Sequence, residues 1–294
     1  MTDARQMSLN YIYYFPLDWK KSCVRRLSDE EQRLIYFELQ KLVETNAVNL
    51  PNEVQGWGTG IVKLFKQYKN KLSLKYNPLG ALRSQEILLL VYHYAAIELS
   101  NKYKNNDPIV CYKIIADLVG KSNNWFNENI TEDTMVHQYL ATFLDHIFCR
   151  DGHFVQKWAN SMLEACKESA CSNDFAAKYK SDFAACVKYL ELQFDVFVVE
   201  VKKPDCDNPG ATSDKVKAAN EAKIMLDMMV TNRVRKPRVC ALVVNGKRCS
   251  TFVLDLIHEA VYSYYELAEF ELVTKINNID NYWKAVESLL QVKV

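Results

Sequence analysis

The feature that most limits how this chain can fold is the apolar run from Phe194 to Val201, which carries Glu200 near its end. Its β-branched and aromatic side chains are typical of a central strand that is buried on both faces. Such a strand favours an α/β core with helices covering the sheet. A charge buried there is costly unless it has a charged partner, a metal or water.

Glycine and proline are scarce, at 8 and 7 of 294 residues. So few chain breakers favour long helices and argue against an all-β sandwich with many tight turns. The net charge is +1, from 37 basic and 36 acidic residues. This balance excludes a surface coated with basic residues, but it leaves room for local basic clusters. The length is typical of two domains.

Before residue 130 the sequence predicts helices and connecting loops, with no strand pattern. Ser28 followed by Glu31 forms a capping box, which predicts the start of an amphipathic helix. Three of the eight glycines lie within Gly56–Gly60, where we expect a loop, the alternative being the lead-in to a helix. Further helices are expected near residues 60–70, 83–104 and 108–119.

After residue 130 the pattern changes to helices alternating with strands. The expected elements are a helix over Glu132–Phe148, strands over Asp182–Leu192 and Phe194–Val201, a helix from Ser213 to about Val230, a hairpin over Val239–Leu256 that turns at Asn245-Gly246, and a last helix over Ile279–Gln291. This order predicts an all-helical domain over residues 1–130, followed by an α/β (α+β) domain over 131–294.

Three polar residues of the expected strands carry the candidate chemistry. Glu200 and Lys202 are two residues apart on one strand, so alternation places them on the same face of the sheet. Asp182 begins the preceding strand, and we expect it to approach Glu200 if the two strands are neighbours. Two carboxylates suit a hard cation such as Mg²⁺ or Mn²⁺, and a nearby ammonium group can help to place an attacking hydroxide. This is the chemistry of phosphodiester hydrolysis.

Asp182 followed by Glu200-x-Lys202 at the end of an apolar strand resembles the PD-(D/E)XK (restriction-endonuclease-like) nuclease superfamily, over roughly residues 131–257. The resemblance implies an αββαββ core with a central mixed sheet, and a Mg²⁺- or Mn²⁺-dependent nuclease that hydrolyses DNA or RNA. The chain departs from the family pattern at Ser181, where the motif has proline.

The resemblance also implies a role for each residue of the site. Lys202 would be the catalytic lysine, together with the two carboxylates. Lys217, on the helix after the motif strand, falls where some families place a supporting basic or amide residue. The metal ligands would be Asp182, Glu200, the Val201 carbonyl and, as an accessory ligand, Glu132.

Two basic clusters could hold a phosphate backbone. Lysines alternate with aromatic residues over Ile61–Tyr76, and a second cluster precedes the expected strand at Val239. For the first cluster the alternative is a solvated helix face whose aromatic residues point into the core. The candidate residues are Lys63, Lys66, Lys69, Lys203, Arg233, Arg235 and Lys236.

Several alternatives stay open at this point. Glu200 and Lys202 could form only an ion pair at the strand end. The chain could be a catalytically silent nuclease-fold protein that binds nucleic acid or protein, or a scaffold whose helical part does the work. Zinc held by His146, Cys149 and His153, or by Cys166 and Cys171, lacks the paired CxxC elements of a zinc site.

The expected partner is nucleic acid, DNA ahead of RNA, and the helical domain could support a homodimer. The N-terminus lacks the apolar core of a signal peptide, and the cysteines number nine, which is odd. The longest apolar stretch, Ile87 to Leu99, is shorter than the roughly 20 residues of a membrane span. We therefore expect an intracellular protein of the nucleus or cytoplasm with no membrane partner.

Overall fold

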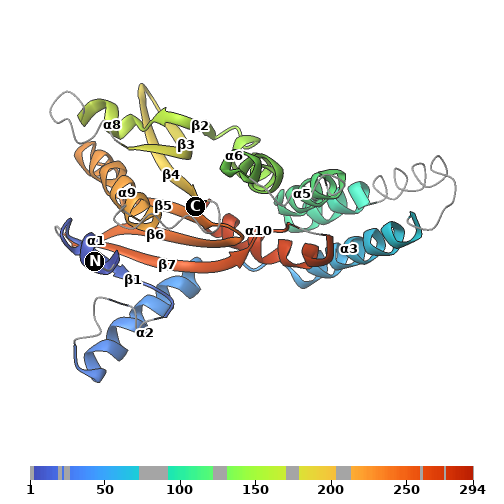
Figure 1. The fold of residues 1–294 in the computed structure, drawn as a ribbon, viewed down its shortest axis with the longest axis horizontal. Coiled ribbons are helices and arrows are strands. Elements are labelled where there is room, and N and C mark those ends of the chain that lie inside the picture. The colour runs from blue at the N-terminus through green and yellow to red at the C-terminus, as the bar shows by residue number, and fades with distance from the viewer. Residues whose placement is uncertain are drawn as a thin grey trace. The chain divides into compact units, whose positions relative to one another are not determined.

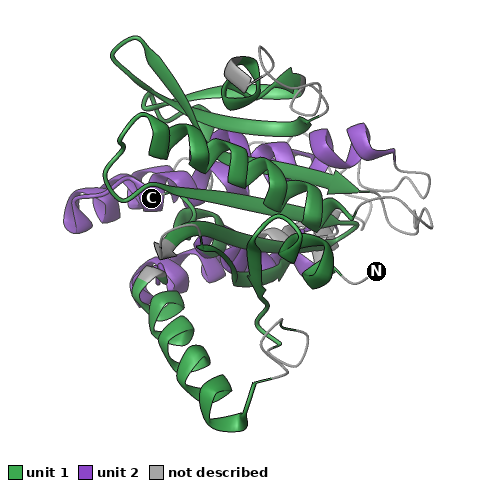
Figure 2. Ribbon diagram, turned by 90° about the vertical axis from the view of Figure 1, so that its left-hand side faces the viewer, with its two compact units in different colours: residues 1–47, 148–271, 288–294 green, residues 48–147, 272–287 purple. Residues whose placement is uncertain are grey.

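The computed structural model describes residues 3–18, 22, 27–72, 92–121, 131–169, 179–202, 213–258, 261–274 and 276–293. The chain forms two compact units that interleave along the sequence (Figure 2). Unit 1 contains residues 1–47, 148–271 and 288–294, and unit 2 contains residues 48–147 and 272–287. The expected single division at residue 130 differs from this arrangement, because each unit is assembled from segments that are distant in the sequence.

Among the described residues, unit 1 is built on a seven-stranded mixed sheet in the order β1-β7-β6-β5-β4-β3-β2 (Figure 1). Strands β2, β3 and β4 pair antiparallel, β4 and β5 pair parallel, β5, β6 and β7 pair antiparallel, and β1 runs parallel to β7. The strands are β1 (Ile12–Phe15), β2 (Phe154–Met162), β3 (Lys180–Tyr189), β4 (Leu192–Lys202), β5 (Arg238–Asn245), β6 (Arg248–His258) and β7 (Val261–Glu271).

The expected strands over 182–192 and 194–201 correspond to β3 and β4, so the coarse α/β prediction is confirmed. Strands β5 and β6 form the expected hairpin, with the turn shifted by one residue. Asn245 pairs with Arg248, which leaves Gly246 and Lys247 in the loop. Gly246 has a φ of 59°, a backbone conformation that glycine adopts without strain.

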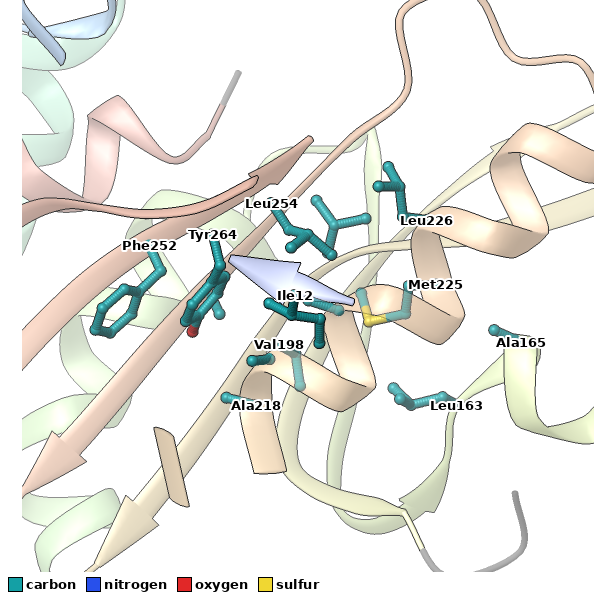
Figure 3. Close-up of a cluster of buried hydrophobic side chains, with 14 of the residues drawn as sticks. Ile12, Leu163, Ala165, Val198, Ala218, Met225, Leu226, Phe252, Leu254 and Tyr264 are labelled. Atoms are coloured by element: carbon teal, nitrogen blue, oxygen red, sulfur yellow. The ribbon is translucent and has the colours of Figure 1, made fainter. Parts of the chain in front are cut away.

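Helix α9 (Asp214–Thr231) covers one face of β4, β5 and β6. Ser213 caps it as expected, because its Oγ accepts a hydrogen bond from the Val216 N–H at 3.2 Å. Beneath the helix lies the core of unit 1, in which side chains of β1, β4, β6, β7 and α9 point toward one another (Figure 3). The labelled residues Ile12, Val198, Met225, Leu226, Leu254 and Tyr264 belong to this core.

The expectation of an all-helical first 130 residues is wrong at β1. This short strand follows helix α1 (Asp3–Ser8) and pairs with β7, with Ile12 opposite Tyr262. Ile12 is fully buried there. The capping box of helix α2 (Asp29–Asn46) is confirmed: the Glu31 carboxylate accepts from the Ser28 N–H at 2.9 Å, and the Ser28 Oγ accepts from the Glu31 N–H at 3.4 Å.

Apart from the strands, the regular elements of the described chain are helices. The expected loop at Gly56–Gly60 is wrong, because these glycines lie inside helix α3. A Cβ added to Gly58 would lie 2.0 Å from the Trp283 ring, so glycine permits this close packing. The elements are α3 (Asn52–Leu72), residues 92–103, α5 (Asp107–Lys121), α6 (Glu132–Met135), η4 (Val136–Leu140), α7 (Ala141–Leu144), η5 (Asp145–Cys149), α8 (Glu164–Ser169), η7 (Ile276–Asn281) and α10 (Tyr282–Gln291).

The helix expected over Glu132–Phe148 is present as one run of helical residues, in which α6, η4, α7 and η5 alternate between α- and π-helical hydrogen bonding. The helix expected at 83–104 is described from residue 92 onward. No helix in the part of the chain that the structure describes is both long enough and apolar enough to cross a membrane.

Candidate active site

The end of β4 presents the two motif residues on the face covered by α9. A register shift relative to β3, between the pairs Cys186–Asp195 and Ala185–Phe197, leaves Val196 as an extra residue. Beyond it the strand alternates regularly. Glu200 Oε2 lies 2.7 Å from the Nζ of Lys217, and Lys202 Nζ lies 3.8 Å from Asp214 Oδ2. Since Lys217 and Asp214 both belong to α9, the expected shared face is confirmed.

Asp182 reaches β4 through its side chain. The pairing of β3 with β4 extends to Phe183 opposite Val199. One residue further along, Asp182 Oδ2 accepts a hydrogen bond of 2.7 Å from the Val201 N–H. The carboxylate therefore takes the place of a backbone acceptor where the two strands separate. Its negative charge is close enough to raise the pKa of the Glu200 carboxyl further, after burial and the charge of Glu221.

Helix α9 contributes a lysine and a second buried glutamate. Lys217 Nζ donates to Glu200 Oε2 at 2.7 Å and to the Lys180 carbonyl at 2.9 Å. It also lies 3.9 Å from Oε1 of Glu221, one helical turn further on. The supporting role that the resemblance implies for Lys217 stays a prediction, and in this structure its ammonium group contacts Glu200.

Glu221 is a site residue that the sequence interpretation missed. It is fully buried, and three neighbours on the same helix, Ala218, Ala219 and Ala222, are buried as well. The available signal was a glutamate set among alanines on the apolar side of a helix, four residues after Lys217. That pattern marks a carboxyl group that folding takes out of water.

The negative charges of the two buried glutamates are only partly balanced by Lys217. Glu200 is 3% exposed and Glu221 0%. Among the described residues, Glu200 Oε1 and both carboxyl oxygens of Glu221 are buried and have no hydrogen-bond donor while both groups are ionised, although the two carboxyl groups can bond to each other when one is protonated. Burial raises the pKa of both carboxyl groups, the charge of Glu221 raises that of Glu200 further, and Lys217 opposes both shifts. The pair therefore needs a proton or another cation to balance its charge.

Val201 and Glu132 differ in how they relate to this pair. Val201 pairs with Val244 of β5, so it lies directly beside the site, and its carbonyl as a metal ligand stays a prediction. Glu132 is exposed in the first turn of α6, which belongs to unit 2. Its accessory role also stays a prediction.

The basic residues are described in part. Arg233, Arg235 and Lys236 are exposed in the turn between α9 and β5. Lys63 is exposed on α3, in unit 2. Lys203 and the side chains of Lys66 and Lys69 lie outside the described residues.

Within the described ranges, no group of three or more His, Cys, Asp or Glu side chains is arranged to hold a metal ion. His146, a residue of the zinc alternative, is bonded to Asp117 at 2.6 Å, and the exposed His153 is bonded to Asp151 at 2.6 Å. The donor set of the acidic pair still suits Mg²⁺ or Mn²⁺, because its free oxygens are carboxylate oxygens. The ammonium group of Lys217 lies beside these oxygens.

Comparison of the chain with protein-family models, with curated proteins and with solved structures finds no match in any of the three.

Proposed function

We propose that the chain is a metal-dependent nuclease that hydrolyses phosphodiester bonds of DNA, or of RNA, at Asp182, Glu200 and Lys202. The observation that carries this proposal is the acidic pair at the end of β4. Glu200 and Glu221 are buried side by side, and three of their carboxyl oxygens have no donor in the described structure while both groups are ionised. Such a pair is costly to bury, and a divalent cation is the ligand that would offset its charge.

The order of the elements along the chain supports the resemblance to the PD-(D/E)XK superfamily. A helical run at 132–149 precedes the antiparallel strands β2, β3 and β4. Helix α9 then leads to β5, which pairs parallel to the motif strand β4. A helix, a mixed sheet carrying the motif, a second helix and a further strand are what the resemblance implies.

Each residue of the site would have a separate role in hydrolysis. Glu200, Glu221 and Asp182 would hold Mg²⁺ or Mn²⁺, which, when bound, polarises a phosphate oxygen and lowers the pKa of a water molecule. Lys202 is partly exposed on the same face, so its ammonium group is available to a phosphate oxygen or to the attacking water. Asp214, 3.8 Å away, keeps this ammonium group near the end of β4.

The basic turn between α9 and β5 supports nucleic acid as the substrate. Arg233, Arg235 and Lys236 are exposed there, in the same unit but at the opposite end of α9 from Lys217, so they would contact phosphates away from the reacting one. Exposed cations of this kind contact backbone phosphates without reading base sequence. Replacing them should weaken binding of all sequences alike and reduce its dependence on salt.

The test is to incubate the purified chain with plasmid DNA, single-stranded DNA and RNA, each with Mg²⁺, Mn²⁺ or EDTA. Cleavage should require the metal. Glu200→Gln and Lys202→Met should each lower its rate by about 10²–10⁴-fold, because each removes a group that acts on the reacting phosphate or water. Lys223→Met, on the same helix but paired with Asp227, is the matched control and should cleave normally.

Cleavage that survives both Glu200→Gln and Lys202→Met would refute the mechanism. Absence of cleavage under every condition would favour the second candidate, a catalytically silent nuclease-fold protein that binds nucleic acid. The observation in favour of this candidate is that Glu200 is already paired with Lys217. Salt-dependent binding of DNA in a gel-shift assay, lost on Arg233→Ala with Arg235→Ala, would support it.

A further inference from the structure

The ammonium group of Lys217 lies in an environment of oxygen atoms. It donates to Glu200 Oε2 at 2.7 Å and to the Lys180 carbonyl at 2.9 Å, and it is 3.9 Å from Glu221 Oε1. Carboxylate and carbonyl oxygens around one positive charge are also the surroundings that Mg²⁺ and Mn²⁺ prefer. A cation, the ammonium group, is therefore already present between the residues that would hold the metal.

A second lysine on α9, Lys223, has an acidic partner that is much more exposed than Glu221. Lys223 pairs with Asp227 at 2.8 Å, with the same four-residue spacing that separates Lys217 from Glu221. The side chain of Asp227 is 40% exposed, whereas that of Glu221 is 0% exposed. Asp227 also accepts a hydrogen bond from the Tyr262 hydroxyl. Lys223 thus forms a common surface ion pair, while Lys217 neutralises acids that water does not reach.

One ammonium group balances one negative charge, so when both buried carboxyl groups are ionised a second positive charge is needed. After Lys217 has bonded to Glu200 Oε2, the other oxygen of Glu200 and both of Glu221 have no donor in the described structure while both groups are ionised. A divalent cation carries twice the charge and, since it binds several oxygens at once, would compensate both carboxylates. Lys217 and the metal are therefore alternatives for the same oxygen atoms.

We propose that Lys217 occupies the cation position of the site and competes with the divalent metal ion, so that the metal enters when the ammonium group leaves. This inference rests on the proposed function. The side chain of Lys217 is 29% exposed on a flexible four-carbon stem, which gives its ammonium group a route to water. Departure frees Glu200 Oε2 to join the oxygens that lack a partner.

The competition would couple metal binding to nucleic-acid binding. A backbone phosphate near the end of β4 offers the released ammonium group a new anionic partner, which lowers the free energy needed to displace it. Each ligand then strengthens the binding of the other, as linkage requires. The site would hold little metal alone and would load when the nucleic acid arrives, which limits unproductive metal binding.

The test measures Mn²⁺ binding to the full chain directly, from the electron paramagnetic resonance signal of the free ion, without nucleic acid. Lys217→Met keeps the length of the side chain and removes its charge, so it should bind Mn²⁺ at least about tenfold more tightly than the wild type. Lys223→Met is the matched control and should bind as the wild type does. Glu200→Gln should abolish binding and so assign it to this site.

Thermal unfolding gives a second measurement. Lys217→Met should melt at a lower temperature than the wild type in EDTA, because it leaves buried carboxylates without a counter-ion. Mn²⁺ should raise its melting temperature more than that of the wild type. Where Lys217→Met does not fold in EDTA, Lys217→Gln retains a hydrogen-bond donor and is measured in the same way.

The coupling is tested in a Lys202→Met background, in which DNA is cleaved too slowly to change during the measurement. An added DNA oligonucleotide should tighten Mn²⁺ binding, and this gain should disappear when Lys217→Met is also present. If Lys217→Met binds Mn²⁺ no more tightly than the wild type while Glu200→Gln abolishes binding, competition is refuted and the proposed function stands. If neither the wild type nor Lys217→Met binds Mn²⁺ through Glu200, with or without the oligonucleotide, both proposals fail.

Discussion

Glu200 and Glu221 face each other at the end of β4 with one lysine between them. Burial raises the pKa of both carboxyl groups, and the presence of Lys217 only partly opposes the rise. A carboxyl group whose pKa is higher in the folded chain than in the unfolded chain stabilises the fold below its unfolded pKa. This contribution is lost as the pH rises through the folded pKa, so the pair should weaken the fold on the alkaline side.

Glu221→Gln should therefore be more stable than the wild type at pH 8 in EDTA, by on the order of 1–3 kcal/mol, and the difference should shrink at pH 4.5. The amide removes a buried charge and can donate to Glu200. Denaturant unfolding followed by tryptophan fluorescence measures this. Glu38→Gln, on the exposed face of α2, is the control and should change little at either pH. If the wild type became more stable relative to Glu221→Gln as the pH rises, the conclusion that ionised Glu221 weakens the fold would be wrong.

At the scale of single elements, local signals placed most helix starts and the motif strand correctly. Ser28 and Ser213 cap α2 and α9 because their hydroxyl oxygens accept from backbone N–H groups three residues ahead. The glycines of α3 misled the sequence interpretation, since glycine is a poor helix former in isolation. Tertiary packing overrides that preference at Gly58, where the Trp283 ring and the Tyr282 hydroxyl lie against the helix backbone.

Gly58→Ala should destabilise the protein by about 1–3 kcal/mol, because its Cβ would lie 2.0 Å from the Trp283 ring and 2.3 Å from the Tyr282 hydroxyl. Gly56→Ala and Gly60→Ala are matched controls on the same helix. A Cβ at either position meets nothing within 4 Å, so alanine should stabilise the helix by about 0.5–1 kcal/mol. Differential scanning calorimetry of the three variants tests this, and equal effects at all three would refute the packing argument.

At the scale of the whole molecule, strands from opposite ends of the sequence meet in one sheet. β1, near the N-terminus, pairs parallel with β7, the last strand, and places Ile12 and Tyr14 in the core of unit 1. Strands β2 and β7 were likewise not predicted. A four-residue segment such as Ile12–Phe15 is too short for its pattern to identify a strand. It forms a strand because pairing with β7 stabilises it.

Ile12→Ala should lower the free energy of unfolding by about 2–5 kcal/mol, the usual cost of a cavity in a packed core. Tyr13→Ala is the control from the same strand: its side chain is 41% exposed, and its loss should cost less than about 1 kcal/mol. Urea unfolding measures both. If the two substitutions destabilise equally, β1 is not part of the core of unit 1.

The sequence by itself determined the strand that carries Glu200 and Lys202, their common face, the helix that follows and the hairpin after it. These features depend on periodicity, capping and turn residues within short segments, and such signals are local. The tertiary structure decided the rest: the approach of Asp182 to Val201, the burial of Glu221 beside Glu200, and the joining of β1 to β7. These contacts arise between distant segments, so their energies exist only after the sheet has assembled. The acidic pair under α9 is such a contact, and it is the reason to look for a cation at the end of β4.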